Sequence, residues 1–354
     1  MRIFRCDSCQ HLVFFENIQC INCHHLLAFL PDLAFIGALE PADSGRWRLR
    51  SAEPGEPGGG EYRLCRNYEQ EQVCNWAVPA ADPNPFCQSC RLTRTIPNLS
   101  QPGNRESWYR LEVAKRRLIY SLLQLDLPLE DKLGHPERGL AFEFLADLPG
   151  SPPVLTGHNQ GVITINIAEA DDAERENRRI QLREPYRTLL GHFRHESGHY
   201  YWDRLLRDHP RLADFRQLFG DEREDYGQAL KRYYDSGTPE GWQQQFISAY
   251  ASAHPWEDWA ETWAHYLHMT DVLETAAACG LAVRPGRPDE PALKAGAPPR
   301  TAGLFERLTA DWFSVTYVLN NLNRSLGLPD GYPFILSPPV VEKLRFVHET
   351  IGER

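Results

Sequence analysis

The sequence predicts an α+β protein in which small β-rich modules at the N-terminus are followed by a mainly helical domain with a small β-sheet. Eight of the nine cysteines fall within the first 90 residues, where short β-like runs such as HLVFF and RWRLR are separated by turn residues. From residue 104 onward, apolar residues recur at helical spacing, with Arg and Lys between them. A chain of 354 residues exceeds the size at which one core keeps growing. We therefore expect a Cys-rich domain at residues 1–100 and a second domain at residues 104–354.

The bulk composition excludes several classes of protein. Hydrophobic residues make up 42% and charged residues 24% of the chain, which is typical of a folded globular protein. The formal net charge of -10 provides no overall field that would attract nucleic acid or an anionic membrane surface. No apolar run approaches the roughly 20 residues needed to span a bilayer, and the opening MRIFRCDSCQ lacks the apolar stretch of a secretory signal. We therefore expect a cytoplasmic protein that does not bind membranes, and the overall charge disfavours nucleic acid as a partner.

Two C-x-x-C pairs open the chain and are typical of a zinc ribbon. Cys6 and Cys9 form the first pair and Cys20 and Cys23 the second, joined by a short apolar stretch. This spacing lets two knuckles present four thiolates tetrahedrally to one zinc ion. Because all four positions are filled by protein, the site is predicted to be structural, and its binding energy helps to fold a module too small to rely on its own core.

A second and less regular set of cysteines follows. Cys87 and Cys90 form a proper knuckle, but Cys65 and Cys74 are separated by eight residues. The favoured interpretation is a second structural four-Cys zinc site. Three alternatives stay open, namely one free cysteine, a histidine that substitutes as a ligand, or a redox pair, and the last is disfavoured because no thioredoxin-like pattern surrounds it. Residues 51–60, SAEPGEPGGG, have the composition of a flexible loop.

The second domain is predicted to contain a small sheet and several helices. Residues 140–147 and 161–167 have the pattern of strands and are expected to pair, with a turn at HNQG between residues 158 and 161. A helix is expected from about residue 185 to just before Pro210. Further helices are predicted at residues 225–234, 241–251, 255–269, 303–326 and 340–351. Cys279, in the run AAACGLA, is expected to be a small buried residue.

The motif HESGH at residues 195–199 lies within the helix expected from residue 185. His195 and His199 are four residues apart, so on a helix they lie about 40° apart in rotation and about 6 Å in rise. Both imidazoles can then reach one tetrahedral zinc ion. Glu196 lies at roughly 100° around the helix, where its carboxylate can face a water molecule on the metal. That placement predicts Glu196 as the general base, and the alternative is that all three residues are merely structural.

A catalytic zinc ion usually has three protein ligands and an open position for water, so a third ligand must come from elsewhere in the chain. The best candidate is Glu257, because Pro255 can open a helix on which Glu257 and Glu261 share a face. Glu261 is then predicted to accept the second ring N–H of His195, which fixes the tautomer of that ligand. The alternative is that both carboxylates merely solvate the helix and complement its N-terminal dipole.

These residues resemble the gluzincin metallopeptidases, which combine HExxH with a later E-x-x-A-E helix, here Glu257 to Glu261. In the lethal-factor-like branch, a tyrosine shortly before the third ligand steadies the oxyanion, and Tyr250 matches that place. The chain also resembles a family of zinc-binding metallopeptidases with an N-terminal zinc ribbon. The residues that carry this likeness are CNWAVPAADPNPFCQSCRLTRTIPNL, HESGHYYWDRL and HPWEDWAETWAHYLHM. The resemblance implies a zincin-like catalytic fold in the second domain and a peptidase reaction.

The expected activity is therefore hydrolysis of a peptide bond in a peptide or protein substrate, with one catalytic and two structural zinc ions as cofactors. The ribbon region is expected to perform no chemistry and to recruit a protein substrate or partner. One alternative is a different zinc-dependent amide hydrolase such as a deamidase, because the same groups suit any acyl transfer to water. The other alternative is a non-catalytic adaptor whose zinc sites scaffold a binding surface, although the intact HESGH disfavours it.

Overall fold

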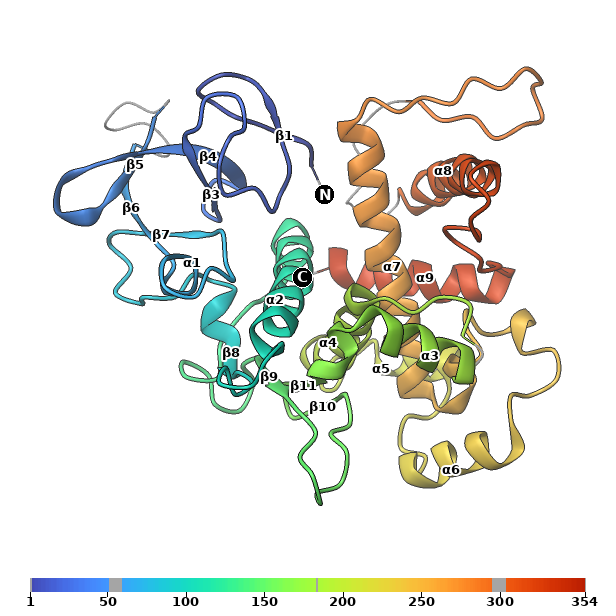
Figure 1. The fold of residues 1–354 in the computed structure, drawn as a ribbon. Helices are drawn as coiled ribbons and strands as arrows, with labels where there is room; N and C mark the ends of the chain where they lie inside the picture. Colours follow the sequence, from blue (N-terminus) through green and yellow to red (C-terminus); the bar gives the residue numbers. More distant parts are fainter. Residues whose placement is uncertain (1, 51–58, 183, 295–303, 354) are drawn as a thin grey trace. The chain divides into compact units, whose positions relative to one another are not determined.

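The computed structural model describes residues 2–50, 59–182, 184–294 and 304–353, which are coloured along the chain in Figure 1. The chain divides into two compact units. The first comprises Met1–Tyr120, Glu130–Thr156 and Thr164–Asp172, and the second comprises Ser121–Leu129, Gly157–Ile163 and Ala173–Arg354. The domain limits at residues 100 and 104 stay a prediction. Among the described residues, no helix is both long and apolar enough to cross a membrane.

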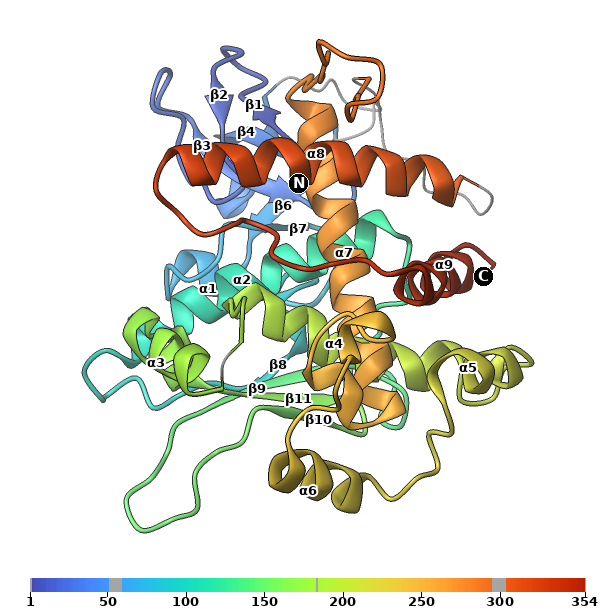
Figure 2. The same cartoon turned by 90° about the vertical axis from the view of Figure 1, so that its right-hand side faces the viewer.

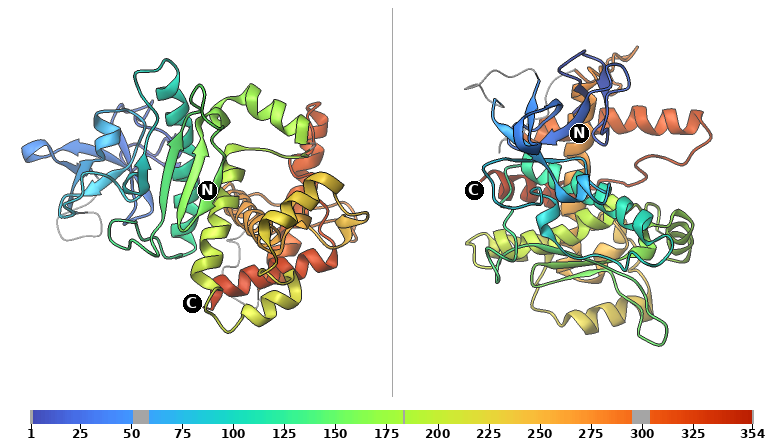
Figure 3. Two further views of the ribbon diagram at one scale, coloured as in Figure 1. Left: turned by 90° about the horizontal axis from the view of Figure 1, so that it is seen from below. Right: turned by 60° about the vertical axis from the view of Figure 1, so that its left-hand side comes forward.

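The N-terminal part of the first unit consists of short antiparallel strands (Figure 3). A two-stranded sheet pairs β1 (Phe4–Arg5) with β2 (Leu12–Val13). A five-stranded sheet follows in chain order, formed by β3 (Leu26–Leu30), β4 (Phe35–Pro41), β5 (Trp47–Leu49), β6 (Glu61–Leu64) and β7 (Ala77–Pro79). The short helix α1 (Arg66–Glu69) and strand β8 (Thr93–Thr95) complete this region. The predicted flexible loop at residues 51–60 lies mostly outside the described residues.

An aromatic cluster forms the core beneath these strands. Phe29 lies at its centre, with ring centroids 4.6 Å from Trp76, 5.2 Å from Phe15 and 5.9 Å from Tyr120. Phe4 contacts Phe15 and Phe29. Most of these rings meet edge to face, the arrangement that aromatic quadrupoles favour. The Cys-rich region is therefore stabilised by a core of its own as well as by its cysteine clusters.

The long helix α2 (Asn104–Gln124) begins where the sequence predicted a change of pattern. Strand β9 (Ala141–Leu145) pairs in parallel with β8, and the sheet order is β10-β11-β9-β8, with β10 at Gly157–Asn159 and β11 at Val162–Asn166. Gln160 and Gly161 form the turn between β10 and β11, and Gly161 has φ +80°, so the predicted strands and their turn are confirmed. A β-rich N-terminal region followed by helices and a small sheet confirms the predicted α+β class.

The second unit is mainly helical (Figure 2). Its helices are α3 (Asp172–Leu182), α4 (Leu189–Leu205), α5 (Leu212–Phe219), α6 (Tyr226–Ser236), α7 (Pro255–Ala278), α8 (Phe305–Ser325) and α9 (Pro338–Gly352). Helix α7 is the central element, since α4, α5, α8 and α9 all pack against it. The predicted helices at residues 225–234, 303–326 and 340–351 correspond to α6, α8 and α9.

Two predictions for the part of this unit before α7 are wrong at particular residues. The helix expected from residue 185 begins at Leu189, because the Thr188 side chain accepts a hydrogen bond from Gly191 N and caps it there. Residues 241–251 form two short 3-10 turns, Trp242–Gln244 and Tyr250–Ala253, instead of a helix. Carbonyl groups of this stretch bond to other segments, as Gln245 O does to Lys343 Nζ at 2.8 Å, so tertiary contacts override the local pattern.

Helix α7 continues to Ala278, beyond the predicted end at residue 269. Cys279, the first residue after it, is exposed, contrary to the expectation that it is buried. The reason is its position, because a residue at the end of the helix no longer lies on the packed face of α7.

Helices α4 and α7 approach each other closely within the HESGH motif. A Cβ atom added to Gly198 would lie 2.9 Å from Ala260 Cα and 3.2 Å from Trp263 Cβ. The two helices are also joined by hydrogen bonds, from Trp259 Nε1 to Gly198 O at 2.9 Å and from Trp263 Nε1 to Ser197 Oγ at 3.1 Å. Only glycine permits so close an approach of two backbones. This contact brings the histidines of α4 opposite the acidic residues of α7.

Candidate functional site

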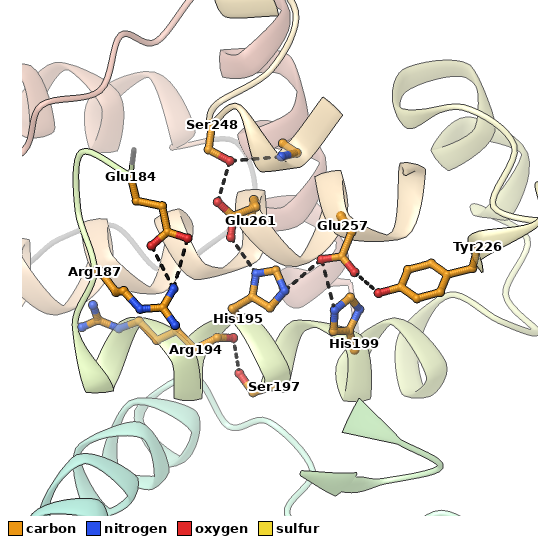
Figure 4. A network of polar contacts seen from close by, with 11 residues as sticks. Glu184, Arg187, Arg194, His195, Ser197, His199, Tyr226, Ser248, Glu257 and Glu261 are labelled. Carbon is orange, nitrogen blue, oxygen red and sulfur yellow. Dashed lines mark hydrogen bonds and ion pairs between the residues drawn. The ribbon is translucent and has the colours of Figure 1, made fainter. Parts of the chain in front are cut away.

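The site lies between α4 and α7, where His195 and His199 face Glu257 (Figure 4). Glu257 Oε2 lies 3.0 Å from His195 Nε2 and 3.6 Å from His199 Nε2. One ligand atom from each of the three residues falls within 4.8 Å of the others. A tetrahedral zinc ion bound at about 2.0–2.1 Å would separate such ligand atoms by roughly 3.3 Å. The structure therefore brings the three predicted catalytic ligands together at distances that suit one zinc ion.

The unsatisfied atoms of this cluster also fit a metal ion. Glu257 is 1% exposed, and among the described residues its buried Oε2 has no hydrogen-bond partner, although it faces both imidazole rings. A buried carboxylate oxygen without a partner carries a large desolvation cost, which a cation would offset. Burial alone would raise the pKa of Glu257, but His199 and His195 hold that pKa well below its usual range. The donor set is therefore one anionic oxygen and two imidazole nitrogens, as zinc prefers.

Glu261 lies one helical turn after Glu257 and contacts the other side of His195. Its Oε1 is 2.6 Å from His195 Nδ1, and its Oε2 accepts a hydrogen bond from Ser248 Oγ at 2.6 Å. Ser248 Oγ in turn accepts from Ala251 N at 3.1 Å. This series of contacts directs the Nδ1 hydrogen of His195 toward Glu261 and leaves Nε2 facing Glu257.

Glu196 occupies the buried face of α4 next to these ligands. It is 6% exposed. Burial raises the pKa of Glu196, and the neighbouring His195 and His199 offset part of that rise. A raised pKa makes the ionised carboxylate a stronger base, which suits a group that takes a proton from water.

Aromatic side chains lie around the three candidate metal ligands. The Tyr250 ring lies 6.0 Å from that of His195, and burial and the charge of Glu257 raise the pKa of Tyr250, which keeps its phenol protonated. Trp256 packs on His199 at 4.0 Å between ring centroids. The Tyr226 hydroxyl donates a hydrogen bond to Glu257 Oε1 at 2.6 Å. A protonated phenol, a buried carboxylate and the three candidate ligands thus lie close together.

Sequence reasoning missed several of these neighbours. Tyr226 lies on α6, 31 residues before its partner Glu257, and no local motif marks that pairing. Ser248 lies in the segment that was wrongly expected to be a helix. His158, on strand β10, stacks on the His199 ring with centroids 6.2 Å apart. For Tyr226 and Ser248 the one signal available was the local density of aromatic residues between positions 226 and 266, which singles out neither of them, and no such signal marks His158.

The first cysteine cluster has the geometry of a four-thiolate site. Two Sγ pairs, Cys6 with Cys23 and Cys9 with Cys20, are each 3.6 Å apart. Zinc–sulfur bonds of about 2.3 Å in a tetrahedron place sulfur atoms roughly 3.8 Å apart. All nine cysteines of the chain are free thiols, so these distances are not those of disulfides. His25 Nδ1 lies 3.2 Å from Cys23 Sγ and is placed to donate a hydrogen bond to that thiolate.

The second cluster is more deeply buried. Its four ligand atoms also lie within 4.8 Å of one another, and they belong to Cys65, Cys74, Cys87 and Cys90. Backbone N–H groups donate to its sulfurs, as Cys87 N does to Cys65 Sγ at 3.3 Å. Arg116, which is 2% exposed, interacts electrostatically with three of these thiols and donates to Val73 O. A zinc ion held by four thiolates would have a net charge of -2, which the guanidinium would partly compensate.

Comparisons with known proteins agree with this arrangement. The sequence profile described as "Putative zinc-binding metallo-peptidase" matches residues 104–350, and a zinc-ribbon domain profile matches residues 3–101. Curated relatives include "Uncharacterized protein Rv2568c" of Mycobacterium tuberculosis and "Uncharacterized protein Mb2598c" of Mycobacterium bovis. Each is 43% identical over 355 residues, which cover 100% of this chain and 96% of the relative. A search of solved structures found no match. The chain therefore belongs to this zinc-binding metallo-peptidase family and carries its zinc-ribbon region at the N-terminus.

Proposed function

We propose that the chain is a zinc metallopeptidase that hydrolyses peptide bonds. The observation that carries this proposal is the convergence of His195, His199 and Glu257 within 4.8 Å, with the buried Glu196 beside them on α4. Three protein ligands leave a tetrahedral ion one open position, as catalytic zinc sites do, whereas structural sites are closed. The family to which the chain belongs supports the same reaction class.

Each residue of the site is proposed to have a distinct role. Zinc bound by His195, His199 and Glu257 would act as a Lewis acid toward a carbonyl group and lower the pKa of a bound water molecule. Glu196 takes the proton of the attacking water and returns it to the leaving amine. Tyr250 donates its phenolic hydrogen to the developing oxyanion, a charge that exists only in the transition state. Glu261 holds the tautomer and orientation of His195.

The two cysteine clusters are proposed to be structural. Each supplies four thiolates and so leaves no open position for a substrate. The chain would then hold three zinc ions, one catalytic and two structural. We further propose that the zinc-ribbon region takes part in contacts with a protein substrate or partner and performs no chemistry itself.

The test combines metal content with product analysis of the full-length chain. We expect about three zinc ions per chain in the wild type and about two in His199→Ala. Glu196→Gln should keep three zinc ions but no longer cleave a peptide library, as measured by mass spectrometry of the products. The matched control is His135→Ala, because His135 is exposed and lies outside the site. Unchanged zinc content in His199→Ala would remove that residue from the ligand set. Deamidated products without chain cleavage would favour an amide hydrolase, and undiminished hydrolysis by Glu196→Gln would favour an adaptor.

A further inference from the structure

We propose that Tyr226 is a positioning residue of the metal site, which holds Glu257 as a one-oxygen ligand. This inference rests on the proposed metal site. It assigns a role to a residue that belongs to neither the HESGH motif nor the acidic segment of α7. It also explains how a carboxylate with two equivalent oxygens presents only one of them to both histidines.

The first step is that the two oxygens of Glu257 have different partners. Oε1 accepts the hydrogen bond of Tyr226 at 2.6 Å, whereas Oε2 faces His195 Nε2 and His199 Nε2. Because a carboxylate only accepts hydrogen bonds, the phenol must be the donor. A short bond to an ionised acceptor is stronger than one between neutral groups. Oε1 is thereby directed toward Tyr226, while Oε2 points to the two imidazole rings (Figure 4).

The second step is the rigidity of Tyr226 itself. It is the first residue of α6, and the Asp225 side chain caps that helix by accepting from Gln228 N at 2.8 Å. The Tyr226 ring packs edge to face on His254, with centroids 5.3 Å apart, and on Trp256, with centroids 5.8 Å apart. His254 is the N-cap of α7, with its Nδ1 accepting from Trp256 N at 3.0 Å. The phenol is therefore oriented by groups at the start of the helix that carries Glu257.

The third step is the consequence for coordination. If both oxygens of Glu257 bound the metal, they would occupy the open position that the hydrolytic reaction needs. A donor on Oε1 prevents this and favours a four-coordinate ion with three protein ligands.

The experiment measures the third metal ion of the full-length chain and needs no activity assay. We expect mild chelation to remove the ion at the His/Glu site while the thiolate sites keep their zinc. The affinity of the emptied site is then measured by titration with zinc against a competing chelator. We expect Tyr226→Phe to bind the third zinc ion about 10–100-fold more weakly, as when other outer-shell partners of metal sites are removed. Tyr317→Phe is the matched control, because Tyr317 is 50% exposed on α8 and lies outside the site.

A spectrum separates this positioning role from a loss of folding. With cobalt(II) at the same site, a four-coordinate ion absorbs visible light more strongly than a five-coordinate one. We expect a strong visible band in the wild type and Tyr317→Phe, and a weaker band in Tyr226→Phe, in which Glu257 is free to bind through both oxygens. Equal affinity and an equal spectrum in Tyr226→Phe would overturn the inference while leaving the metal site intact. A wild-type chain that binds no third ion, or a His199→Ala chain that still does, would overturn the proposed function as well.

Discussion

Replacing Gly198 by alanine tests whether the close approach of α4 and α7 builds the metal site. The added methyl carbon would lie 2.9 Å from Ala260 Cα and 3.2 Å from Trp263 Cβ, whereas carbon atoms pack best at about 3.5–4.0 Å. Ala260 Cα belongs to the backbone and cannot rotate away. The helices must therefore separate by roughly 0.5–1 Å or remain compressed.

The magnitude follows from two opposing effects. Overpacking of a core costs about 1–3 kcal/mol, and a rigid backbone contact places Gly198→Ala in the upper part of that range. Alanine in a helix interior contributes about 1 kcal/mol of stability relative to glycine. The net expectation is a loss of about 1–2 kcal/mol, which corresponds to a fall in Tm of roughly 2–8 °C for a unit of this size. Because the ligands lie on both helices, affinity for the third zinc ion should fall at least about tenfold.

The loss of stability is measured by thermal unfolding monitored by circular dichroism. The loss of zinc affinity is measured by zinc titration after mild chelation. Gly227→Ala on α6 is the control, because its new methyl group would meet only Asp225 Oδ1 at 3.5 Å, an ordinary contact. That variant should be neutral or slightly stabilised. The reasoning would be refuted if Gly198→Ala raised the stability, as the same change does at an exposed helical position, and left the zinc affinity unchanged.

Two further predictions concern buried charges of the second unit. Lys343→Met should cost about 3–5 kcal/mol in urea unfolding, because it leaves Asp258, fully buried and 2.6 Å from Lys343 Nζ, without its partner. The double variant Asp258→Leu/Lys343→Met should regain most of that loss, and a double variant as unstable as the single one would contradict this. His265, beside Glu261 and Arg194, is buried, and burial lowers its pKa to about 4. Below about pH 6.5 the unfolded residue takes up a proton and the folded one does not, so the free energy of unfolding decreases as the pH is lowered. Between pH 8 and pH 5.5 the wild type should lose about 1.4 kcal/mol more than His265→Asn. Parallel stability curves for the two chains would refute this.

Much of the architecture could be predicted because its signals are local. The helical spacing after residue 104, the turn at Gln160 and Gly161, and Pro255 at the start of α7 each act within a few residues. The failure at residues 241–251 shows the limit of such signals. Their carbonyl groups bond to Ser337 and Lys343, about 90 residues further along the chain, and no local pattern records that partner.

The sequence by itself determined which side chains are available for metal chemistry and which of them share a helix face. His195 with His199, and Glu257 with Glu261, are each separated by one helical turn, and the period of the helix makes them neighbours. Only the tertiary structure decided that these two faces meet, because that contact depends on the close packing of α4 on α7 at Gly198. It also placed the Tyr226 hydroxyl on Glu257, a contact between separate helices whose distance along the chain has no fixed period. Periodic geometry can be deduced from spacing, whereas contacts between elements depend on how whole faces pack.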